Sequence, residues 1–229
     1  MTNDFKGKTI QFPSKDGLII TADLYLIGDS DAPFIILYHQ AGYSRGEYRP
    51  IAPKLNDLGF NCISIDQCSG NEVNDVINQT HLDAENKNLP SDYLDALPDM
   101  EAAFDYVKTS LKAKEIIIWG SSYSASLAFY MGSVHPDIKG ILVFSPGEYF
   151  ELDEKKISDF AAKVECPVFI TSSKSEGIQW QGIFEALKGE KYFYLPQDEG
   201  YHGSQALWPV HAGNEMCWKE VERFLSRMK

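Results

Sequence analysis

The sequence predicts an α/β fold in which a mostly parallel sheet of about eight strands is covered by helices on both faces. The chain opens with two short apolar runs joined by Lys15-Asp16-Gly17, which is typical of an antiparallel hairpin. After this pair, short apolar runs alternate with segments of helical spacing, as in a parallel sheet covered by helices. The 229 residues contain no repeat, linker or low-complexity tract, so we expect a single domain over residues 1–229.

The strands are predicted from short runs rich in β-branched and aromatic residues. They lie at 9–13, 19–26, 34–38, 61–66, 116–118, 141–144, 167–171 and 191–195. Most of these runs lack polar alternation, which is typical of strands that are buried on both faces.

The helices are predicted from apolar residues that recur every three or four positions. These segments lie at 47–58, 93–111, 123–131, 155–164, 178–187 and 214–228. Residues 67–92 are polar and rich in Asn and Asp, so we expect a long irregular connection there, either functional or mobile.

The composition excludes several classes of function. The formal net charge is −12 and no basic stripe occurs, which argues against binding to nucleic acid. No apolar run approaches the roughly 18 residues of a membrane span. The four cysteines form no Cys-x-x-Cys pair, so we expect neither zinc nor another metal. The first residues do not resemble a signal peptide, which favours the cytoplasm; a signal peptide already removed would leave the same sequence.

The strongest motif lies where the run 116–118 turns into a helix-forming segment at Tyr123. The turn contains Gly120 and Ser122. A strand, a sharp turn and a helix are the context of a nucleophile elbow, which lifts a serine hydroxyl above the sheet. Ser124 stands where the Gly-x-Ser-x-Gly pattern has its second glycine, and serine is small enough for the turn. The alternative interpretation is that Gly-Ser-Ser only caps the next helix.

Two further polar residues come just past later strands. Glu176 follows the run 167–171 and His202 follows the last run. The loops at the carboxyl ends of parallel strands meet at one edge of a sheet, so we expect a serine, a carboxylate and a histidine to meet there. Asp198 and Glu199 are rival carboxylates because they lie close to His202 in sequence. The alternative is a helix first-turn carboxylate and a surface histidine.

The other four histidines do not have that position. His39 ends an earlier strand and is interpreted as structural. The rest lie in loops or in the polar passage: His81, His135 and His211.

At this point the chain resembles the α/β-hydrolase superfamily over nearly its whole length, and most of all small esterases similar to dienelactone hydrolase. The resemblance rests on Tyr38-His39-Gln40-Ala41-Gly42, Gly120-Ser121-Ser122-Tyr123-Ser124, residues 167–176 and Tyr201-His202-Gly203-Ser204. It implies a three-layer sandwich in which Ser122 is the nucleophile, His202 the base and Glu176 the acid. Dienelactone hydrolases use a cysteine nucleophile, and this chain has Ser122 instead.

The same resemblance implies an oxyanion hole made by the Tyr123 N–H and a second donor after the strand 34–38. Gln40 and Ala41 are held jointly for that second donor, because Gln40 replaces a glycine common in relatives. The chain also departs from the superfamily at Asp66-Gln67-Cys68, where an arginine is common in the place of Cys68. This change puts the geometry of the local loop in question and leaves the triad untouched.

The residues that separate two of the later strands bear on the substrate. Residues 146–166 leave room for one helix and no true cap, so we expect an open, shallow site. Four aromatic side chains are candidates for its walls: Tyr43, Tyr149, Trp180 and Tyr201. Each could equally be ordinary packing. An open aromatic cleft suits small or extended acyl esters, and no basic cluster is present to clamp a phosphate or coenzyme A.

The leading hypothesis is a serine carboxylesterase that acts through an acyl-enzyme without a cofactor. A serine peptidase, amidase or thioesterase of the same fold is the first alternative, and a catalytically silent binding protein is the second. The expected partner is a small-molecule ester. Monomer and homodimer both remain open, as does the natural substrate.

Overall fold

The computed structural model describes residues 6–229. They form two compact units, the first ending at Lys114 and the second covering Glu115–Lys229. The main sheet has eight strands and is mostly parallel, with an antiparallel pair at the N-terminus. The predicted α/β fold is thereby confirmed. No helix within residues 6–229 has both the length and the apolar character needed to cross a bilayer.

The first unit contains the antiparallel part of the sheet. Its strands are β1 (Lys8–Pro13), β2 (Ile19–Tyr25), β3 (Phe34–Tyr38) and β4 (Asn61–Ile65), in the order β1-β2-β4-β3. β2 pairs antiparallel with β1 and with β4, whereas β3 and β4 are parallel. Every residue of β3 and β4 is buried, as the uninterrupted apolar runs predict. A separate ribbon joins β5 (Glu72–Val73) to β6 (Val76–Ile77).

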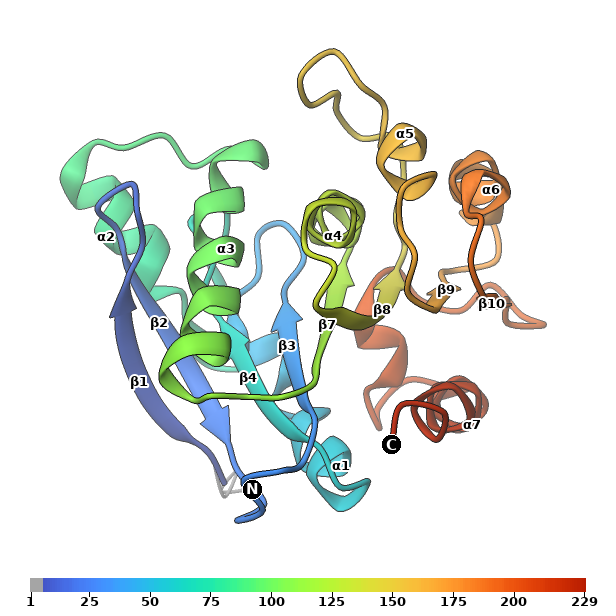
Figure 1. Cartoon of the computed structure of the whole chain (residues 1–229), viewed down its shortest axis with the longest axis horizontal. Coiled ribbons are helices and arrows are strands. Elements are labelled where there is room, and N and C mark those ends of the chain that lie inside the picture. Colours follow the sequence, from blue (N-terminus) through green and yellow to red (C-terminus); the bar gives the residue numbers. More distant parts are fainter. Residues whose placement is uncertain (1–5) are drawn as a thin grey trace. The chain divides into compact units, whose positions relative to one another are not determined.

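The helices of the first unit differ from the prediction in two places. They are η1 (Arg45–Tyr48), α1 (Ala52–Asp57), α2 (Gln79–Lys87), η2 (Leu94–Ala96) and α3 (Leu97–Asp105), which a π turn, η3 (Tyr106–Ser110), extends. The expected helix 47–58 is split, and Pro53 stands in the first turn of its second part. The expectation of an irregular segment over 67–92 is wrong for α2, seen beside β2 in Figure 1. The Asn78 side chain caps this helix by accepting the His81 N–H at 2.8 Å.

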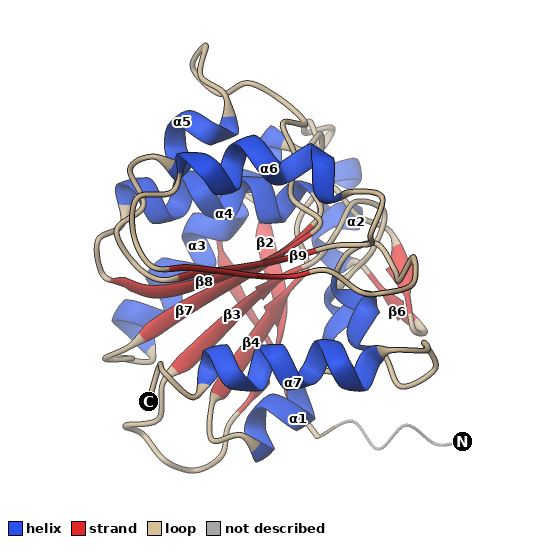
Figure 2. Ribbon diagram, turned by 90° about the vertical axis from the view of Figure 1, so that its right-hand side faces the viewer, coloured by secondary structure: helices blue, strands red, loops and turns tan. Residues whose placement is uncertain are grey.

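The second unit is a parallel α/β layer structure. Its strands are β7 (Ile116–Ser121), β8 (Ile138–Phe144), β9 (Val168–Thr171) and β10 (Lys191–Tyr194), paired in that order and all parallel. Its helices are α4 (Tyr123–Val134), α5 (Ile157–Ala161), α6 (Gly177–Ala186) and α7 (Asn214–Leu225), with a short turn η4 (Ser204–Leu207). Figure 2 shows α4, α5 and α6 on one face of these strands and α7 on the other.

An aromatic row forms the core of the second unit. Trp119 of β7 stacks on Phe144 of β8, with ring centroids 4.8 Å apart. Phe169 of β9 follows at 6.3 Å from Phe144, and Phe224 of α7 follows at 5.8 Å from Phe169. Such contacts fix the strands against each other and against α7. Because the strands are parallel, the loops after β7, β8, β9 and β10 lie at one edge.

Candidate active site

Ser122 stands on a strained turn between β7 and α4. Its backbone angles are φ 60° and ψ −122°, a region that side chains other than glycine rarely occupy. Gly120 makes the turn possible, because a Cβ there would lie 2.5 Å from the Ser124 carbonyl oxygen. The turn is also tied to the next strand by the Ser122 N–H, which donates to the Phe144 carbonyl at 2.7 Å. Strained turns between a strand and a helix recur at functional sites.

Ser124, which replaces the second glycine of the motif, fits the turn and adds contacts to it. Its side chain is fully buried. The hydroxyl donates to the Ser121 carbonyl and accepts the Ser121 N–H, both at 2.9 Å. These two hydrogen bonds hold Ser121, the residue before Ser122, in place. The departure from the motif therefore leaves the turn intact.

Glu176 and His202 meet directly. Glu176 precedes the first residue of α6, just past β9, and its Oε1 accepts a hydrogen bond from Nδ1 of His202, which lies past β10. The other carboxylate oxygen accepts the Ser145 hydroxyl at 2.8 Å and the Ser173 N–H at 3.2 Å. Burial raises the pKa of Glu176, but the hydrogen bonds from these three residues outweigh it and lower the pKa to about 2.

The ionised carboxylate determines which imidazole nitrogen carries the proton. A carboxylate only accepts, so Nδ1 of His202 must donate the proton, and Nε2 keeps a lone pair in the neutral ring. The His202 side chain is 38% exposed while that of Glu176 is 16% exposed. The carboxylate is therefore covered, while the imidazole remains open to solvent.

Hydrogen bonds hold the loop after β10 beside the turn that carries Ser122. The Gly203 N–H donates to the Ser145 hydroxyl and the Ser204 N–H donates to the Ser121 hydroxyl, both at 2.9 Å. The indole N–H of Trp119 donates to the Ser204 hydroxyl, also at 2.9 Å. These bonds bring the segments that carry Ser122, Glu176 and His202 to one edge of the second unit. Within residues 6–229 the Ser122 hydroxyl makes no hydrogen bond of its own. Catalytic hydrogen bonds often tighten only when substrate is bound.

The rival carboxylates have other positions. Glu199 receives the Ser175 hydroxyl on Oε1 and the Lys174 N–H on its carbonyl oxygen, the latter at 2.7 Å. Asp198 lines a surface pocket of about 570 Å³ together with Tyr194 and Met216. The carboxylate that contacts the His202 imidazole is that of Glu176.

Ser145 was not singled out from the sequence, although it contacts both the acid and the histidine loop. It follows β8 directly in Ser145-Pro146-Gly147, and its φ of 55° is unusual for serine. A serine at the carboxyl end of the strand next to the nucleophile strand was the signal that could have indicated it.

The residues proposed for the oxyanion hole lie in different units. Tyr123 is the first residue of α4, so its N–H belongs to the positive end of the helix dipole. In the first unit, the Gln40 N–H donates to the buried Glu47 carboxylate at 2.9 Å. The backbone of Gln40 is thereby occupied, and Ala41 is left as the backbone candidate. Among residues 6–229, the buried Oε1 of Gln40 accepts no hydrogen bond. These assignments remain predictions.

His39 and Asp66 are held inside the first unit. Burial lowers the pKa of His39 to about 4, so the ring is neutral. Its Nε2 accepts the Gln67 N–H at 2.9 Å, and its Nδ1 lies 2.8 Å from the Gln40 carbonyl. Nη1 of Arg45 lies 2.5 Å from Oδ2 of Asp66, so an arginine from another position in the sequence contacts the aspartate that begins this motif. Nothing in the spacing of the sequence pointed to Arg45.

The four candidate wall residues have different environments. The Tyr149 hydroxyl donates to the Ser145 carbonyl at 2.8 Å, and 38% of the residue is exposed. Tyr201 stacks on His211 with ring centroids 3.7 Å apart. Trp180 is buried and donates to the Ser172 hydroxyl at 2.8 Å. Tyr43 lies in the first unit. Of these side chains, Tyr149 is attached directly to the hydrogen bonds around Glu176.

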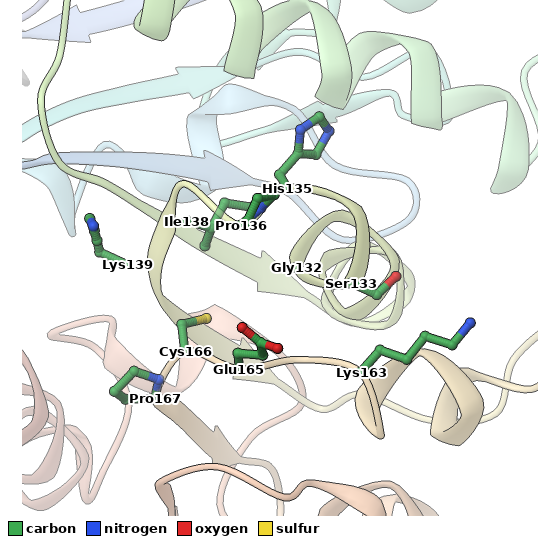
Figure 3. Close-up of a pocket in the computed structure, with 10 residues that line it drawn as sticks. All are labelled: Gly132, Ser133, His135, Pro136, Ile138, Lys139, Lys163, Glu165, Cys166 and Pro167. Atoms are coloured by element: carbon green, nitrogen blue, oxygen red, sulfur yellow. The ribbon is translucent and has the colours of Figure 1, made fainter.

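A second pocket lies at the opposite, amino ends of β8 and β9, and Figure 3 labels the residues that line it. Its volume is about 490 Å³. Burial raises the pKa of the Cys166 thiol to about 12, so the nucleophilic thiolate is scarce at neutral pH. Figure 3 also shows the His135 imidazole directed away from Cys166. Cys166 and His135 therefore do not face each other as a nucleophile and a base would in this pocket.

No family model and no curated protein matched the chain. Solved structures match it closely in shape at low sequence identity. The Pyrococcus furiosus esterase Pf2001 aligns with a TM-score of 0.73 at 17% identity, covering 98% of this chain and 93% of that one. Est1E from Butyrivibrio proteoclasticus with bound ferulic acid aligns with a TM-score of 0.72 at 15% identity, covering 95% of this chain and 98% of that one. The dienelactone hydrolase from Anabaena variabilis aligns with a TM-score of 0.73 at 12% identity, covering 97% of this chain and 98% of that one. The α/β-hydrolase fold predicted from the sequence is confirmed.

Proposed function

We propose that this chain, an α/β-hydrolase by its fold, is a serine hydrolase that cleaves carboxylic esters of small molecules through an acyl-enzyme. The observation that carries the proposal is the Glu176–His202 hydrogen bond at the edge where Ser122 stands on its strained turn. The esterases and the dienelactone hydrolase among the structural neighbours support hydrolysis of esters.

The first half-reaction forms the acyl-enzyme. Ser122 Oγ attacks the ester carbonyl carbon while Nε2 of His202 takes the hydroxyl proton. Glu176 stabilises the imidazolium that results, since its carboxylate stays ionised. Negative charge collects on the former carbonyl oxygen, where the Tyr123 N–H would stabilise it by about 3 kcal/mol. The tetrahedral intermediate then collapses as His202 returns the proton to the leaving alkoxide, which departs as the alcohol.

The second half-reaction releases the acid. A water molecule attacks the acyl carbon while Nε2 of His202 takes one of its protons. The bond from carbon to Ser122 Oγ breaks, and the proton passes back to Oγ. Water has then been consumed, one ester bond has been cleaved, and the enzyme is restored with no cofactor involved.

The test compares the purified chain with Ser122→Ala on short nitrophenyl esters, with Ser133→Ala on the same helix as the matched control. We expect Ser122→Ala to lose at least about 10³-fold in kcat/KM, and the control to keep wild-type activity. A fluorophosphonate probe should label wild type and control but not Ser122→Ala.

Three results separate the alternatives. Hydrolysis that survives in Ser122→Ala contradicts the mechanism. Absence of both labelling and hydrolysis in the wild type favours a catalytically silent binding protein. Labelling without ester turnover, together with cleavage of nitroanilides or thioesters, favours a peptidase, amidase or thioesterase of the same fold.

A further inference from the structure

The backbone N–H, the backbone carbonyl, the hydroxyl proton and the hydroxyl oxygen of Ser145 all form hydrogen bonds. Their partners lie in the loops that carry Glu176 and His202 or in the segments next to them. The N–H of Ser145 donates to the Thr171 carbonyl at 2.7 Å, and its carbonyl accepts the Tyr149 hydroxyl at 2.8 Å. Its own hydroxyl contacts Glu176 at 2.8 Å and the Gly203 N–H at 2.9 Å. The residue is fully buried. A single side chain thus joins the loop of the acid to the loop of the histidine.

The chemistry of its two partners fixes the direction of both bonds. The Glu176 carboxylate is ionised and can only accept, so the hydroxyl must give it its one proton. The Gly203 N–H can only donate, so it takes a lone pair of the same oxygen. The hydroxyl therefore has no freedom to rotate while both loops keep their positions. A bond from an uncharged hydroxyl to a carboxylate in a covered site is among the stronger hydrogen bonds in proteins.

We propose that Ser145 is a positioning residue of the hydrolase: it holds Glu176 Oε2 so that Oε1 faces the His202 imidazole. The proposal rests on the proposed function and names a residue beyond the Ser-His-Glu set. With the hydroxyl present, Oε2 receives the Ser145 and Ser173 donors on one side and Oε1 is left for His202. Without it, one donor to Oε2 and one anchor of the His202 loop are lost together.

The backbone of Ser145 makes a clean variant available. Its φ of 55° is strained for serine and freely accessible to glycine. Ser145→Gly therefore deletes the hydroxyl without forcing the backbone to move. Ser145→Ala deletes the same hydroxyl and keeps the strain. Two variants that lose activity alike, despite different backbone preferences, would locate the effect in the hydroxyl.

Ser126 provides the matched control. Its buried hydroxyl also bridges two groups, donating to the Gly147 carbonyl at 2.7 Å and accepting the Gly147 N–H at 3.1 Å. It anchors the same loop two residues further on, and neither of its bonds involves Glu176 or the His202 loop. Ser126→Ala thus reproduces the loss of a buried serine and leaves the acid untouched.

The kinetic test measures nitrophenyl ester hydrolysis and thermal unfolding of wild type, Ser145→Gly, Ser145→Ala and Ser126→Ala. We expect kcat of both Ser145 variants to fall about ten- to hundredfold with KM within about twofold, because misplaced catalytic groups affect the chemical step more than binding. Ser126→Ala should keep kcat within about threefold. Unchanged kcat in the folded Ser145→Gly protein, with wild type active, overturns the proposal. An inactive wild type would instead count against the proposed function itself.

A double variant separates positioning through Glu176 from general support of the fold. In the Glu176→Gln background, Ser145→Gly should lower the rate of fluorophosphonate labelling by less than about threefold, since the carboxylate it serves is already gone. An undiminished ten- to hundredfold loss in that background overturns the proposal. A spectroscopic readout adds a measurement without substrate: the downfield proton resonance of His202 Nδ1–H should shift or broaden in Ser145→Gly and stay in place in Ser126→Ala. A resonance that does not change in Ser145→Gly would contradict the proposal.

Discussion

Two carboxyl groups, one in each unit, are covered by the protein and reach opposite charge states. Glu176 in the second unit receives hydrogen bonds from His202, Ser145 and Ser173, and its pKa is lowered to about 2. Asp99 in the first unit is fully buried and accepts the Cys68 N–H at 2.7 Å. The other oxygen of this carboxyl group, Oδ1, has no hydrogen-bond partner among residues 6–229. Burial raises the pKa of Asp99 to about 8.

The two groups differ both in depth of burial and in the number of donors, and the balance of these two influences decides which group is charged. Burial is the largest influence on both pKa values and raises both. At Glu176 the hydrogen bonds overcome it, so the group is an anion that can orient an imidazole and stabilise its cation. At Asp99 they do not, so the group stays a neutral acid in the core at physiological pH. The chemistry proposed for the edge of the second unit depends on this difference.

Replacing Glu176 and Asp99 by their amides should give the largest difference in kcat/KM between the two carboxyl groups. Glu176→Gln should lower kcat/KM about 10⁴-fold, because an amide cannot balance the charge of the imidazolium and can favour the wrong tautomer. Asp99→Asn should keep kcat/KM within about threefold, because the acid it replaces is already neutral. Both are measured on the same nitrophenyl ester.

A similar loss in both variants would contradict the distinction drawn between the two carboxyl groups. Asp198→Asn serves as the control for the first variant, because this rival carboxylate is close to His202 in sequence but lines a separate surface pocket. It should behave as wild type.

Much of the fold could be predicted because the strands are short buried runs with clear boundaries. Ser122, Glu176 and His202 could be proposed because each follows such a run, and topology brings the ends of parallel strands together. Their catalytic roles remain predictions. The pattern also predicted a tight turn, since Gly120 and Ser122 follow the predicted strand 116–118 and precede the helix-forming segment; in the structure β7 continues to Ser121 and Ser122 alone separates it from α4.

The supporting residues could not be predicted in the same way. Ser145 acts through contacts with residues 31 and 58 positions away, which no local spacing encodes. Asp99 lies in an ordinary helix pattern, and its environment is set by Cys68, 31 positions distant. The helix α2 was missed because it is polar and its signal is a single cap, Asn78. Its stability depends on tertiary contacts more than on propensity.

The free energy of unfolding of Asp99→Asn should depend on pH differently from that of wild type. The folded pKa of Asp99, about 8, lies above its ordinary value of 3.8, so this acid favours the folded state fully at low pH. That contribution is lost as pH rises from about 4 through about 8. Asparagine does not titrate, so the variant should gain several kcal/mol on wild type over this range, because a pKa difference of one is worth about 1.4 kcal/mol. Urea unfolding at several pH values measures the difference. A difference that stays constant from pH 4 to 8 would mean that Asp99 is ionised in the folded protein.

Glu176→Gln should show the opposite slope at lower pH. The folded pKa of Glu176, about 2, lies below its ordinary value of 4.5. The stability from its hydrogen bonds is therefore present above about 4.5 and lost as pH falls toward about 2. For a half-buried group the contribution is roughly 1 kcal/mol after solvent screening. Urea unfolding should show wild type ahead of the variant at neutral pH, with the gap closing in acid. A gap that widens in acid would reverse the assignment of the charge state.

Glu199 is an exposed carboxylate, and Glu199→Gln should have the smallest effect on activity and stability. Glu199 receives the Ser175 hydroxyl and N–H, and these hydrogen bonds lower its pKa as donors do at Glu176. Without burial, however, water can replace both donors, so their loss costs little. We expect kcat/KM within about twofold of wild type and a midpoint of thermal unfolding within about 1 °C. Because Glu199 is three residues from His202, a loss of activity as large as that of Glu176→Gln would transfer the role of the acid to Glu199. Wild-type behaviour would show that a donor-rich carboxylate acts on the imidazole only where it is also covered and in direct contact with it.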